Sequence, residues 1–362
     1  MSDLKFEIVP SAAPMPADER SIILQDPGFG SVFTDHMAVI KYSDDKGWHD
    51  AQITARAPIP LDPATSVLHY AQEIFEGMKA YNTPDGQAAL FRPYENARRF
   101  QQSAQRMAMP ELPEEIFVES VKHIVEIDKD WIPNIEGGSL YLRPFMFASE
   151  VFLGVRPAKE YLYMVIASPA GGYFKSGAPA ISIWVSKDYS RAAQGGTGAA
   201  KCGGNYAASL SAQAQAIEHG CDQVVFLDAA EQKWVEELGG MNLFFLFDDK
   251  KVITPPLSGT ILPGITRDAI ITLLKDQGYD VSEAPYSINQ WRDDAANGAL
   301  KEVFACGTAA VVTSVGKICS DDGEFSIGNG GPGELTGELR EQLTKIQRCT
   351  GPDPYGWGVK LG

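Results

Sequence analysis

The chain contains few cysteines and no paired cysteine motif. Among its 362 residues there are five, without a CxxC unit: Cys202, Cys221, Cys306, Cys319 and Cys349. A disulfide framework or a zinc knuckle requires paired or closely spaced cysteines, so neither is supported. We therefore expect a protein of the reducing cytoplasm.

Metal ligands and a common hydrolase motif are also lacking. The five histidines never fall at metal-ligand spacing: His36, His49, His69, His123 and His219. We expect no bound metal for this reason. The sequence has no Gly-x-Ser-x-Gly nucleophile elbow either, which argues against an α/β-hydrolase.

The chain also has few basic residues relative to acidic ones, and it lacks long apolar runs. The chain has 31 basic and 47 acidic residues, a net charge of −16, which repels phosphate backbones and anionic lipids. No apolar run approaches the ~20 residues that span a bilayer, and residues 1–20 lack the pattern of a signal peptide. We expect neither nucleic-acid nor membrane partners.

The composition that is present, 44% apolar and 22% charged residues, is that of a globular protein. Hydrophobic periodicity predicts a mixed α and β chain without repeats. The expected strands are 31–43, 86–93, 139–147, 160–169, 223–227, 241–247 and 251–254. The expected helices are 95–109, 114–127, 205–220 and 266–278, and a capping box of Ser287 and Gln290 is expected to open another.

The length favours two domains, at ~150 residues each as a prior. A stretch rich in Gly, Ser and Pro follows the strand expected at 160–169. Such residues are typical of loops and linkers. We predict a smaller N-terminal α/β domain over 1–172, a linker over 173–183 and a larger C-terminal domain over 184–362.

Two glycine-rich motifs superficially suggest nucleotide binding. In GGTGAAKC (195–202), Ala200 and Cys202 flank Lys201 where a P-loop requires Gly and Ser or Thr. GNGGPG (328–333) formally matches GxGxxG but has no second strand behind it and no acidic residue at the right distance. We interpret the second motif as a loop before a last helix.

Lys201 stands alone among small residues in GGTGAAKCGGNYA. Glycines allow a ligand to approach the backbone closely, and a lysine in such a setting can form a Schiff base with an aldehyde cofactor. The local run alone also fits an ordinary surface-loop lysine. The neighbouring motifs favour the chemical interpretation.

These motifs are AKCGGNYAASL, VEELGGMNLFF, TPPLSGTILPGITRDAI and EVFACGTAAVV, in this order and spacing. The first half adds FTDHM, LHYAQEIFEGMKAY, LFRP, SLYLRP, FLGV and AGGYF. Together they resemble the branched-chain amino acid aminotransferases of the fold-type IV pyridoxal-phosphate enzymes, over roughly residues 29–350. The resemblance implies an α+β fold of two domains, similar to D-amino acid aminotransferase, with the active site in the interdomain cleft and a cofactor-binding C-terminal domain.

The resemblance also implies a set of cofactor residues. Lys201 would form the internal aldimine with pyridoxal 5'-phosphate and later carry the proton between substrate and cofactor. Glu237 would keep the pyridine nitrogen protonated, and Tyr206 would hydrogen-bond the phenolic oxygen. The implied phosphate ligands are Arg92, the backbone amides of Ile265 and Thr266, and the Thr308 hydroxyl.

Substrate recognition follows from the same resemblance. The amides of Thr308 and Ala309 would bind the α-carboxylate, and Arg143 would meet the distal carboxylate of glutamate. The residues implied to wall the apolar pocket are Phe29, Phe75, Tyr141 and Tyr173. Leu153 and Val155 would reach the partner's site in a homodimer, with Tyr70 in the same neighbourhood.

Two positions depart from the family pattern. Gly240 stands where a threonine is often found, which removes a hydroxyl near the carboxylate site and leaves substrate preference open. Ala310 and Thr313 occupy the positions of a CxxC redox pair found in some animal members, so we expect no thiol switch.

The implied reaction is a ping-pong transamination. L-Leucine, L-isoleucine or L-valine would give its amino group to the cofactor and leave as a 2-oxo acid, and 2-oxoglutarate would collect the amine as L-glutamate. The alternatives of the same fold are a D-amino acid aminotransferase and an aminodeoxychorismate lyase. A catalytically silent binding protein is a further alternative, against which the intact Lys201, Arg92, Tyr206 and Glu237 argue.

Overall fold

The computed structural model describes residues 4–172 and 180–361, which form two compact units. The N-terminal unit comprises residues 4–172, 200–203 and 345–361, and the C-terminal unit comprises 180–199 and 204–344. Lys201 therefore belongs with the N-terminal unit, although the segments before residue 200 and after residue 203 belong to the other. The expected domain boundaries stay a prediction, and residues 173–179 of the expected linker lie outside the described residues.

A nine-stranded sheet forms the centre of the N-terminal unit, in the order β1-β3-β2-β8-β7-β5-β6-β18, with β4 paired to β7. Neighbouring strands are antiparallel except β1 and β3. The strands are β1 (Glu7–Ile8), β2 (His36–Ser43), β3 (Gly47–Ala55), β4 (Glu73–Phe75), β5 (Met78–Asn82), β6 (Ala88–Phe91), β7 (Ser139–Ala148), β8 (Glu160–Ala170) and β18 (Gly358–Leu361).

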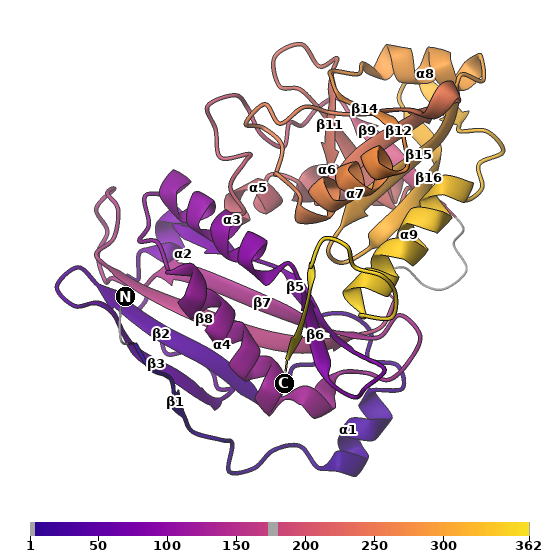
Figure 1. Ribbon diagram of the computed structural model, residues 1–362. Coiled ribbons are helices and arrows are strands. Elements are labelled where there is room, and N and C mark those ends of the chain that lie inside the picture. Colours follow the sequence, from indigo (N-terminus) through magenta and orange to yellow (C-terminus); the bar gives the residue numbers. More distant parts are fainter. Residues whose placement is uncertain (1–3, 173–179, 362) are drawn as a thin grey trace. The chain divides into compact units, whose positions relative to one another are not determined.

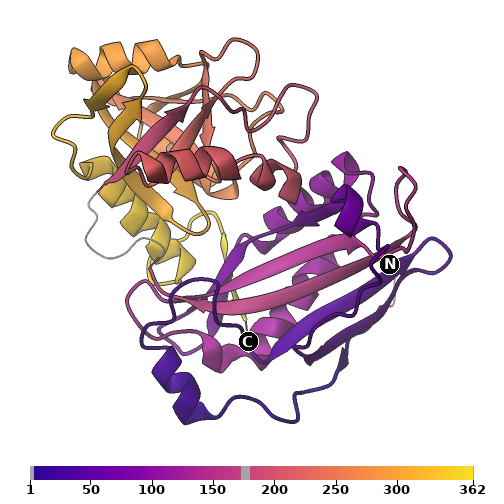
Figure 2. The ribbon, with the colours of Figure 1, turned by 180° about the vertical axis from the view of Figure 1, so that it is seen from behind.

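Helices α3 and α4 cover one face of this sheet in Figure 1, and the opposite face comes to the front in Figure 2. Phe100 of α3 lies 5.3 Å from the ring of Phe117 on α4 and 5.6 Å from the ring of Tyr163 on β8, so both helices join one apolar core. The helices of this unit are α1 (Ala17–Ile23), α2 (Val67–Tyr70), α3 (Pro93–Arg106), α4 (Glu114–Ile127) and the 3₁₀ turn Lys129–Trp131.

The C-terminal unit contains the second nine-stranded sheet, in the order β11-β10-β9-β16-β15-β12-β13-β14, with β17 paired to β16. This sheet mixes parallel and antiparallel neighbours. The strands are β9 (Ile181–Ser186), β10 (Gln223–Leu227), β11 (Val235–Leu238), β12 (Asn242–Phe247), β13 (Lys251–Thr254), β14 (Asp280–Glu283), β15 (Leu300–Gly307), β16 (Val311–Ser320) and β17 (Gly323–Ser326).

Helices pack on both faces of the second sheet. Helix α6 meets the cluster that contains Trp184 and Phe226, whereas Trp291 of α8 packs against Phe245 in the other cluster. Successive strand residues point to opposite faces, so Val185 and Val225 belong to the α8 side. The helices are α5 (Gly203–Ala207), α6 (Leu210–Glu218), α7 (Ile265–Asp276), α8 (Ile288–Ala296), α9 (Glu334–Gln347) and the 3₁₀ turn Asp248–Lys250.

Most expected elements are confirmed. The helix expected over 114–127 and the strands expected over 223–227 and 251–254 have those bounds, and the capping box of Ser287 and Gln290 is present. The single helix expected over 205–220 is wrong, because it is divided into α5 and α6. At the break, the N–H of Ser209 bonds to the carbonyl of Tyr206, only three residues back, and its hydroxyl bonds to the carbonyl of Asn205.

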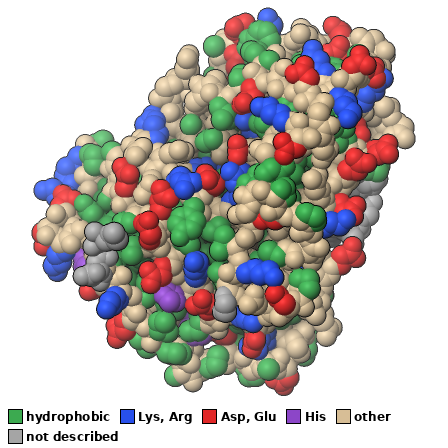
Figure 3. All heavy atoms as spheres, in the orientation of Figure 1, with side chains coloured by type: hydrophobic (Ala, Val, Ile, Leu, Met, Phe, Trp, Pro, Cys, Tyr) green, Lys and Arg blue, Asp and Glu red, His purple; other side chains and the backbone are tan. Residues whose placement is uncertain are grey.

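The surface is charged with both signs. On the face drawn in Figure 3, acidic and basic side chains of the described residues are interspersed and form no continuous basic patch. Within residues 4–172 and 180–361, no helix combines the length and the apolar character needed to cross a membrane.

Candidate active site

Three backbone hydrogen bonds fix the segment around Lys201 within the N-terminal unit. The N–H of Lys201 donates to the Ser103 hydroxyl on α3 at 2.9 Å, and its carbonyl accepts from the N–H of Phe75 on β4, also at 2.9 Å. The N–H of Gly203 donates to the carboxylate of Glu73, which occupies the space that a Cβ at Gly203 would need. A strand and a helix thus hold the candidate catalytic lysine from both sides.

Aromatic and cationic side chains surround the lysine amine. Its Nζ lies 4.8 Å from the centroid of the Phe75 ring, and the guanidinium carbon of Arg143 lies 4.6 Å from that centroid. Arg143 donates to the Tyr141 hydroxyl at 3.0 Å, and the Tyr141 ring contacts Phe29 edge-on at 5.1 Å. Five of the residues expected in the site therefore form one continuous group.

Two adjacent features shape this group. Tyr141 and Arg143 share one face of β7 because they are two residues apart on a strand. Gly77 lies against Tyr141, whose hydroxyl would collide with any Cβ at that position.

Burial raises the pKa of the Glu73 carboxyl, although its hydrogen bond from Gly203 and the charge of Arg143 act in the opposite direction.

A buried ion pair lies beside the lysine. Glu76 is fully buried, and its two carboxylate oxygens accept from Arg99 at 2.7 and 2.8 Å, while Asn96 donates to it at 2.7 Å. Burial raises the pKa of Glu76, but the combined effect of Arg99, Lys201 and Asn96 is larger and leaves it below its ordinary value. Glu76 is therefore a fixed negative charge near the Lys201 side chain.

Arg92 occupies a specialised backbone position. It directly precedes α3 with φ of 49°, in the left-handed region, and Pro93 opens the helix. Its guanidinium carbon lies 5.0 Å from the Trp357 ring centroid. The residue lines a cavity of about 300 Å³, which gives a phosphate-sized group access to this side chain.

Tyr70, Leu153 and Val155 form a separate surface group in the same unit. The Tyr70 hydroxyl donates to the carbonyl of Leu153. Leu153 is 61% exposed and Val155 is 89% exposed, which is unusual for large apolar side chains. Tyr173, the remaining residue expected in the substrate wall, lies outside the described residues.

Glu237 is a buried carboxylate on β11 of the C-terminal unit. Its oxygens accept from the N–H of Leu262 at 3.0 Å and from the side-chain amide of Asn242 at 3.3 Å, and Arg191 forms an ion pair with it. The carboxylate is thus surrounded by hydrogen-bond donors. Neither Arg191 nor Asn242 was expected from the sequence, although Asn242 lies within the MNLFF motif.

Asn242 also connects Glu237 with the start of α7. Its amide donates to the carbonyl of Leu262 at 3.1 Å and occupies the space next to Gly264, where a Cβ could not fit. Helix α7 begins at Ile265, directly after Gly264, so the amides of Ile265 and Thr266 lie in its first turn. The first amides of a helix lack intrahelical acceptors and favour anions.

Tyr206, Gly240 and the turn after β15 lie close together. A Cβ placed on Gly240 would contact the Tyr206 ring at 3.7 Å, and one on Gly307 would lie 3.4 Å from the Gly240 carbonyl. Thr308 and Ala309 follow Gly307 in the turn between β15 and β16. The C-terminal unit therefore gathers a second group of the expected residues.

Sequence comparisons identify the family. Residues 73–318 match the model of the amino-transferase class IV family, a span that includes Lys201, Arg92, Tyr206, Glu237 and Thr308. This family and the two-sheet fold define an aminotransferase of class IV. Pyridoxal 5'-phosphate is the cofactor of this class.

Similarity to individual relatives identifies the group within this family. The chain is 56% identical to a probable branched-chain-amino-acid aminotransferase of Streptomyces coelicolor, over 99% of both chains. It is 54% identical to the branched-chain-amino-acid aminotransferase of Mycolicibacterium smegmatis, over 99% of this chain and 98% of that one. A solved branched-chain amino acid aminotransferase from Escherichia coli is 28% identical, with a TM-score of 0.74, and 90% of this chain and 100% of that chain are covered. This chain belongs to the branched-chain-amino-acid aminotransferases of class IV.

Proposed function

We propose that the protein transfers the amino group reversibly between L-leucine, L-isoleucine or L-valine and 2-oxoglutarate. The observation that carries this proposal is that Lys201 and Arg143 both lie within 5 Å of the centroid of one aromatic ring, that of Phe75, at 4.8 and 4.6 Å. An amine for covalent chemistry and a guanidinium for a carboxylate then adjoin an aromatic surface that suits apolar side chains. The full-length identity to branched-chain-amino-acid aminotransferases supports the same substrates.

The donor set fits pyridoxal 5'-phosphate. Lys201 offers an amine for the aldehyde, and Glu237 is a buried carboxylate that suits a protonated ring nitrogen. The α7 N-terminus and the cavity at Arg92 suit a phosphate. When bound, the cofactor supplies an aldehyde for the amino group and an electron sink for the electron pair left at Cα.

Lys201 is proposed to move the proton. Its Nζ takes the proton from the substrate Cα as a general base and later returns it as an acid. The backbone bonds to Ser103 and Phe75 hold the lysine stem in place, so only the side chain has to move.

Glu237 is proposed to hold a proton on the pyridine nitrogen. Its ion pair with Arg191 and the donors Leu262 and Asn242 stabilise the carboxylate form. A carboxylate keeps the facing nitrogen protonated through a charge-assisted hydrogen bond. Tyr206 is proposed to donate to the phenolic oxygen.

Substrate selection is proposed to use one pocket for two classes of side chain. Phe29, Phe75, Tyr141 and Tyr173 wall the apolar part, while Arg143 binds the distal carboxylate of glutamate and 2-oxoglutarate. The Thr308 and Ala309 amides are proposed to bind the α-carboxylate. A buried carboxylate without a cationic partner is costly, so Arg143 is the residue on which glutamate binding depends.

We further propose a homodimer in the cytoplasm. The exposed apolar side chains of Leu153 and Val155 support the first part, because a partner subunit would remove them from water. All five cysteines are free thiols, which supports a reducing compartment.

A parallel assay of amino donors tests the substrate proposal. The holoenzyme is supplied with 2-oxoglutarate and with L-leucine, L-isoleucine, L-valine or D-alanine, and glutamate is quantified. Aminodeoxychorismate is tested separately for pyruvate release. We expect the three branched-chain donors to exceed D-alanine in kcat/KM by at least 100-fold. Preference for D-alanine, or lyase activity, would assign the protein to an alternative activity of the same fold.

A further inference from the structure

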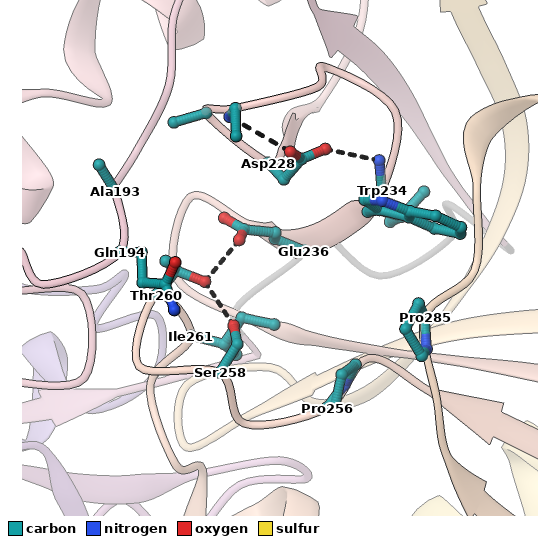
Figure 4. A pocket seen from close by; sticks show the side chains of 13 residues that line it. Ala193, Gln194, Asp228, Trp234, Glu236, Pro256, Ser258, Thr260, Ile261 and Pro285 are labelled. Carbon is teal, nitrogen blue, oxygen red and sulfur yellow. Dashed lines mark hydrogen bonds between the residues drawn. The ribbon is translucent and has the colours of Figure 1, made fainter.

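The C-terminal unit contains a second pocket that the proposed transamination does not use. It has a volume of about 400 Å³ and is lined by loop and strand residues that include Trp234, Glu236, Pro256, Thr260 and Pro285 (Figure 4). Volumes of this order are typical of small-molecule sites. All of its lining residues belong to one compact unit.

One side chain in this pocket has an unfilled hydrogen-bonding capacity. Glu236 is only 7% exposed, and one of its carboxylate oxygens accepts from the Thr260 hydroxyl. Its other oxygen, Oε2, is buried and has no hydrogen-bond partner among the described residues. Leaving a buried acceptor unpaired is costly, so a ligand that donates to it gains free energy.

Glu236 is distinct from the proposed cofactor residue next to it. Successive residues of β11 point to opposite faces, and Glu236 and Glu237 accordingly have different hydrogen-bond partners. Figure 4 shows the Glu236 carboxylate turned towards Thr260, with Trp234 and Pro285 on another side of the pocket. The two carboxylates therefore have different surroundings.

The electrostatics of the pocket favour a cation. The pKa of Glu236 is raised, mainly by burial and also by the negative charge of Asp228. The hydrogen bond from Thr260 and the positive charge of Arg191 act in the opposite direction but are outweighed. Asp228 accepts backbone N–H groups from Ala230 and three further residues of its loop; burial raises its pKa, but these bonds outweigh that effect and lower it. The pocket thus combines an ionised carboxylate with a second one that a cation would stabilise.

The rest of the pocket is largely apolar. Trp234, Pro256 and Pro285 supply hydrophobic surface around Glu236. A metal ion does not suit such a wall, whereas a compact organic cation buries its body against it. Free amino acids are also poor candidates, because their carboxylate would be repelled by Asp228 and Glu236.

We propose that this pocket binds a small organic ammonium ion with an apolar body and no carboxylate. The ammonium donates a hydrogen bond to Oε2 of Glu236, and the body packs on Trp234 and the prolines. Such a site lies beyond the transamination proposed above, and its occupancy does not depend on which amino acid the enzyme uses.

Binding can be tested with three probes of similar size that share a 3-phenylpropyl body. N,N-Dimethyl-3-phenylpropylamine is a cation with one N–H donor and cannot condense with an aldehyde cofactor. 4-Phenylbutan-1-ol is neutral, and 4-phenylbutanoate is an anion. Their affinities for the holoenzyme are measured by calorimetry, with Trp fluorescence as a second signal. We expect the cation to bind at least tenfold more tightly than the alcohol, and the anion not to bind.

Matched variants assign the site. Glu236→Gln should lower the affinity for the cation at least tenfold and change the affinity for the alcohol by less than threefold. Glu218 is an exposed carboxylate of the same unit, and Glu218→Gln should change neither affinity. Ala193→Phe, at the exposed rim of the pocket, should lower the affinities for both probes. Equal affinities of the cation and the alcohol, or a cation affinity unchanged in both pocket variants, would overturn the proposal. Leucine transamination measured in the same samples reports on the proposed function separately.

Discussion

The carbonyl of Lys201 accepts a hydrogen bond from the N–H of Phe75 at 2.9 Å, and the Phe75 ring lies 4.8 Å from the lysine amine. One residue of β4 therefore fixes both the backbone and the surroundings of the candidate catalytic side chain. Since residues 200–203 pack with the N-terminal unit, the lysine is held by elements far from it in sequence. This relationship makes the role of Lys201 directly testable.

Replacing Lys201 should abolish turnover. Lys201→Ala removes the amine, and Lys201→Arg keeps a positive charge that cannot act as nucleophile or base at neutral pH. We expect both variants to lose amino transfer while keeping the wild-type fold by circular dichroism. Borohydride reduction of the wild-type holoenzyme, followed by peptide mapping, should locate the cofactor on Lys201. An adduct on another lysine would refute the catalytic assignment.

Glu237→Gln should slow the reaction more than it reduces cofactor occupancy. Glutamine keeps the shape but loses the charge that holds the ring nitrogen protonated. Losing a charge-assisted hydrogen bond of ~1.5–3 kcal/mol lowers kcat by roughly one to two decades if the bond acts fully in the transition state. Occupancy is measured by absorbance and kcat by steady-state assay. An unchanged kcat would remove Glu237 from this role.

Arg143→Met should separate the two substrate classes. Methionine keeps an apolar stem but cannot pair with the distal carboxylate, at a cost of ~2–4 kcal/mol. We expect kcat/KM for 2-oxoglutarate to fall roughly 30- to 1000-fold, with a much smaller change for leucine. Single-turnover kinetics measure the two half-reactions separately, and Arg340→Met, at an exposed position of α9, is the control. Equal losses in both halves would show that Arg143 supports the fold or the cofactor instead.

A mixed-subunit experiment tests the proposed dimer. If Leu153 and Val155 complete the partner's site, Lys201→Ala and Val155→Asp subunits should each be inactive alone. Mixing them should restore activity, because one site of each mixed dimer has both an intact lysine and an intact loop. Native mass spectrometry verifies that the subunits exchange. Exchange without recovered activity would contradict a shared site.

The buried pair of Glu76 and Arg99 predicts a pH-dependent stability. Glu76→Gln leaves the Arg99 guanidinium buried without its carboxylate, which should cost ~3–5 kcal/mol in the free energy of unfolding at pH 7. The pKa of Glu76 is lower in the folded protein than in the unfolded chain, where it is about 4.3. Its stabilisation is therefore complete above about pH 5 and is lost as the pH falls through the folded-state pKa.

Urea denaturation of wild type and Glu76→Gln at pH 7, 5, 4 and 3 measures this difference. The difference in the free energy of unfolding between the two proteins should be the same at pH 7 and pH 5 and should become smaller below pH 4. If this difference in free energy stays the same down to pH 3, the ionised carboxylate is not what stabilises this region.

Much of the fold was predictable from local sequence. The apolar periodicity of 114–127 and the cap at Ser287 specify their helices without help from the rest of the chain. The division of the helix expected over 205–220 was not predictable, because it depends on how Ser209 bonds to the preceding turn. Propensity alone cannot distinguish a serine that continues a helix from one that interrupts it.

The sequence motifs predicted a set of candidate residues, and these roles stay predictions; the motifs did not predict the contacts that hold the residues in place. Motifs identified Lys201 and Glu237, yet gave no indication that Ser103 anchors the lysine or that Arg191 pairs with the glutamate. These partners come from segments without a motif, and only the fold brings them together. Glu236 lies within the motif VEELGGMNLFF, but its burial cannot be predicted from the sequence because it depends on the fold.

The most direct test of the central claim follows the nitrogen atom. The holoenzyme is incubated with ¹⁵N-labelled L-leucine and 2-oxoglutarate, and the products are identified by NMR and mass spectrometry. Branched-chain transamination predicts ¹⁵N-labelled L-glutamate and 4-methyl-2-oxopentanoate in equal amounts, with no label in ammonia. Absence of labelled glutamate, or release of the label as ammonia, would contradict the account.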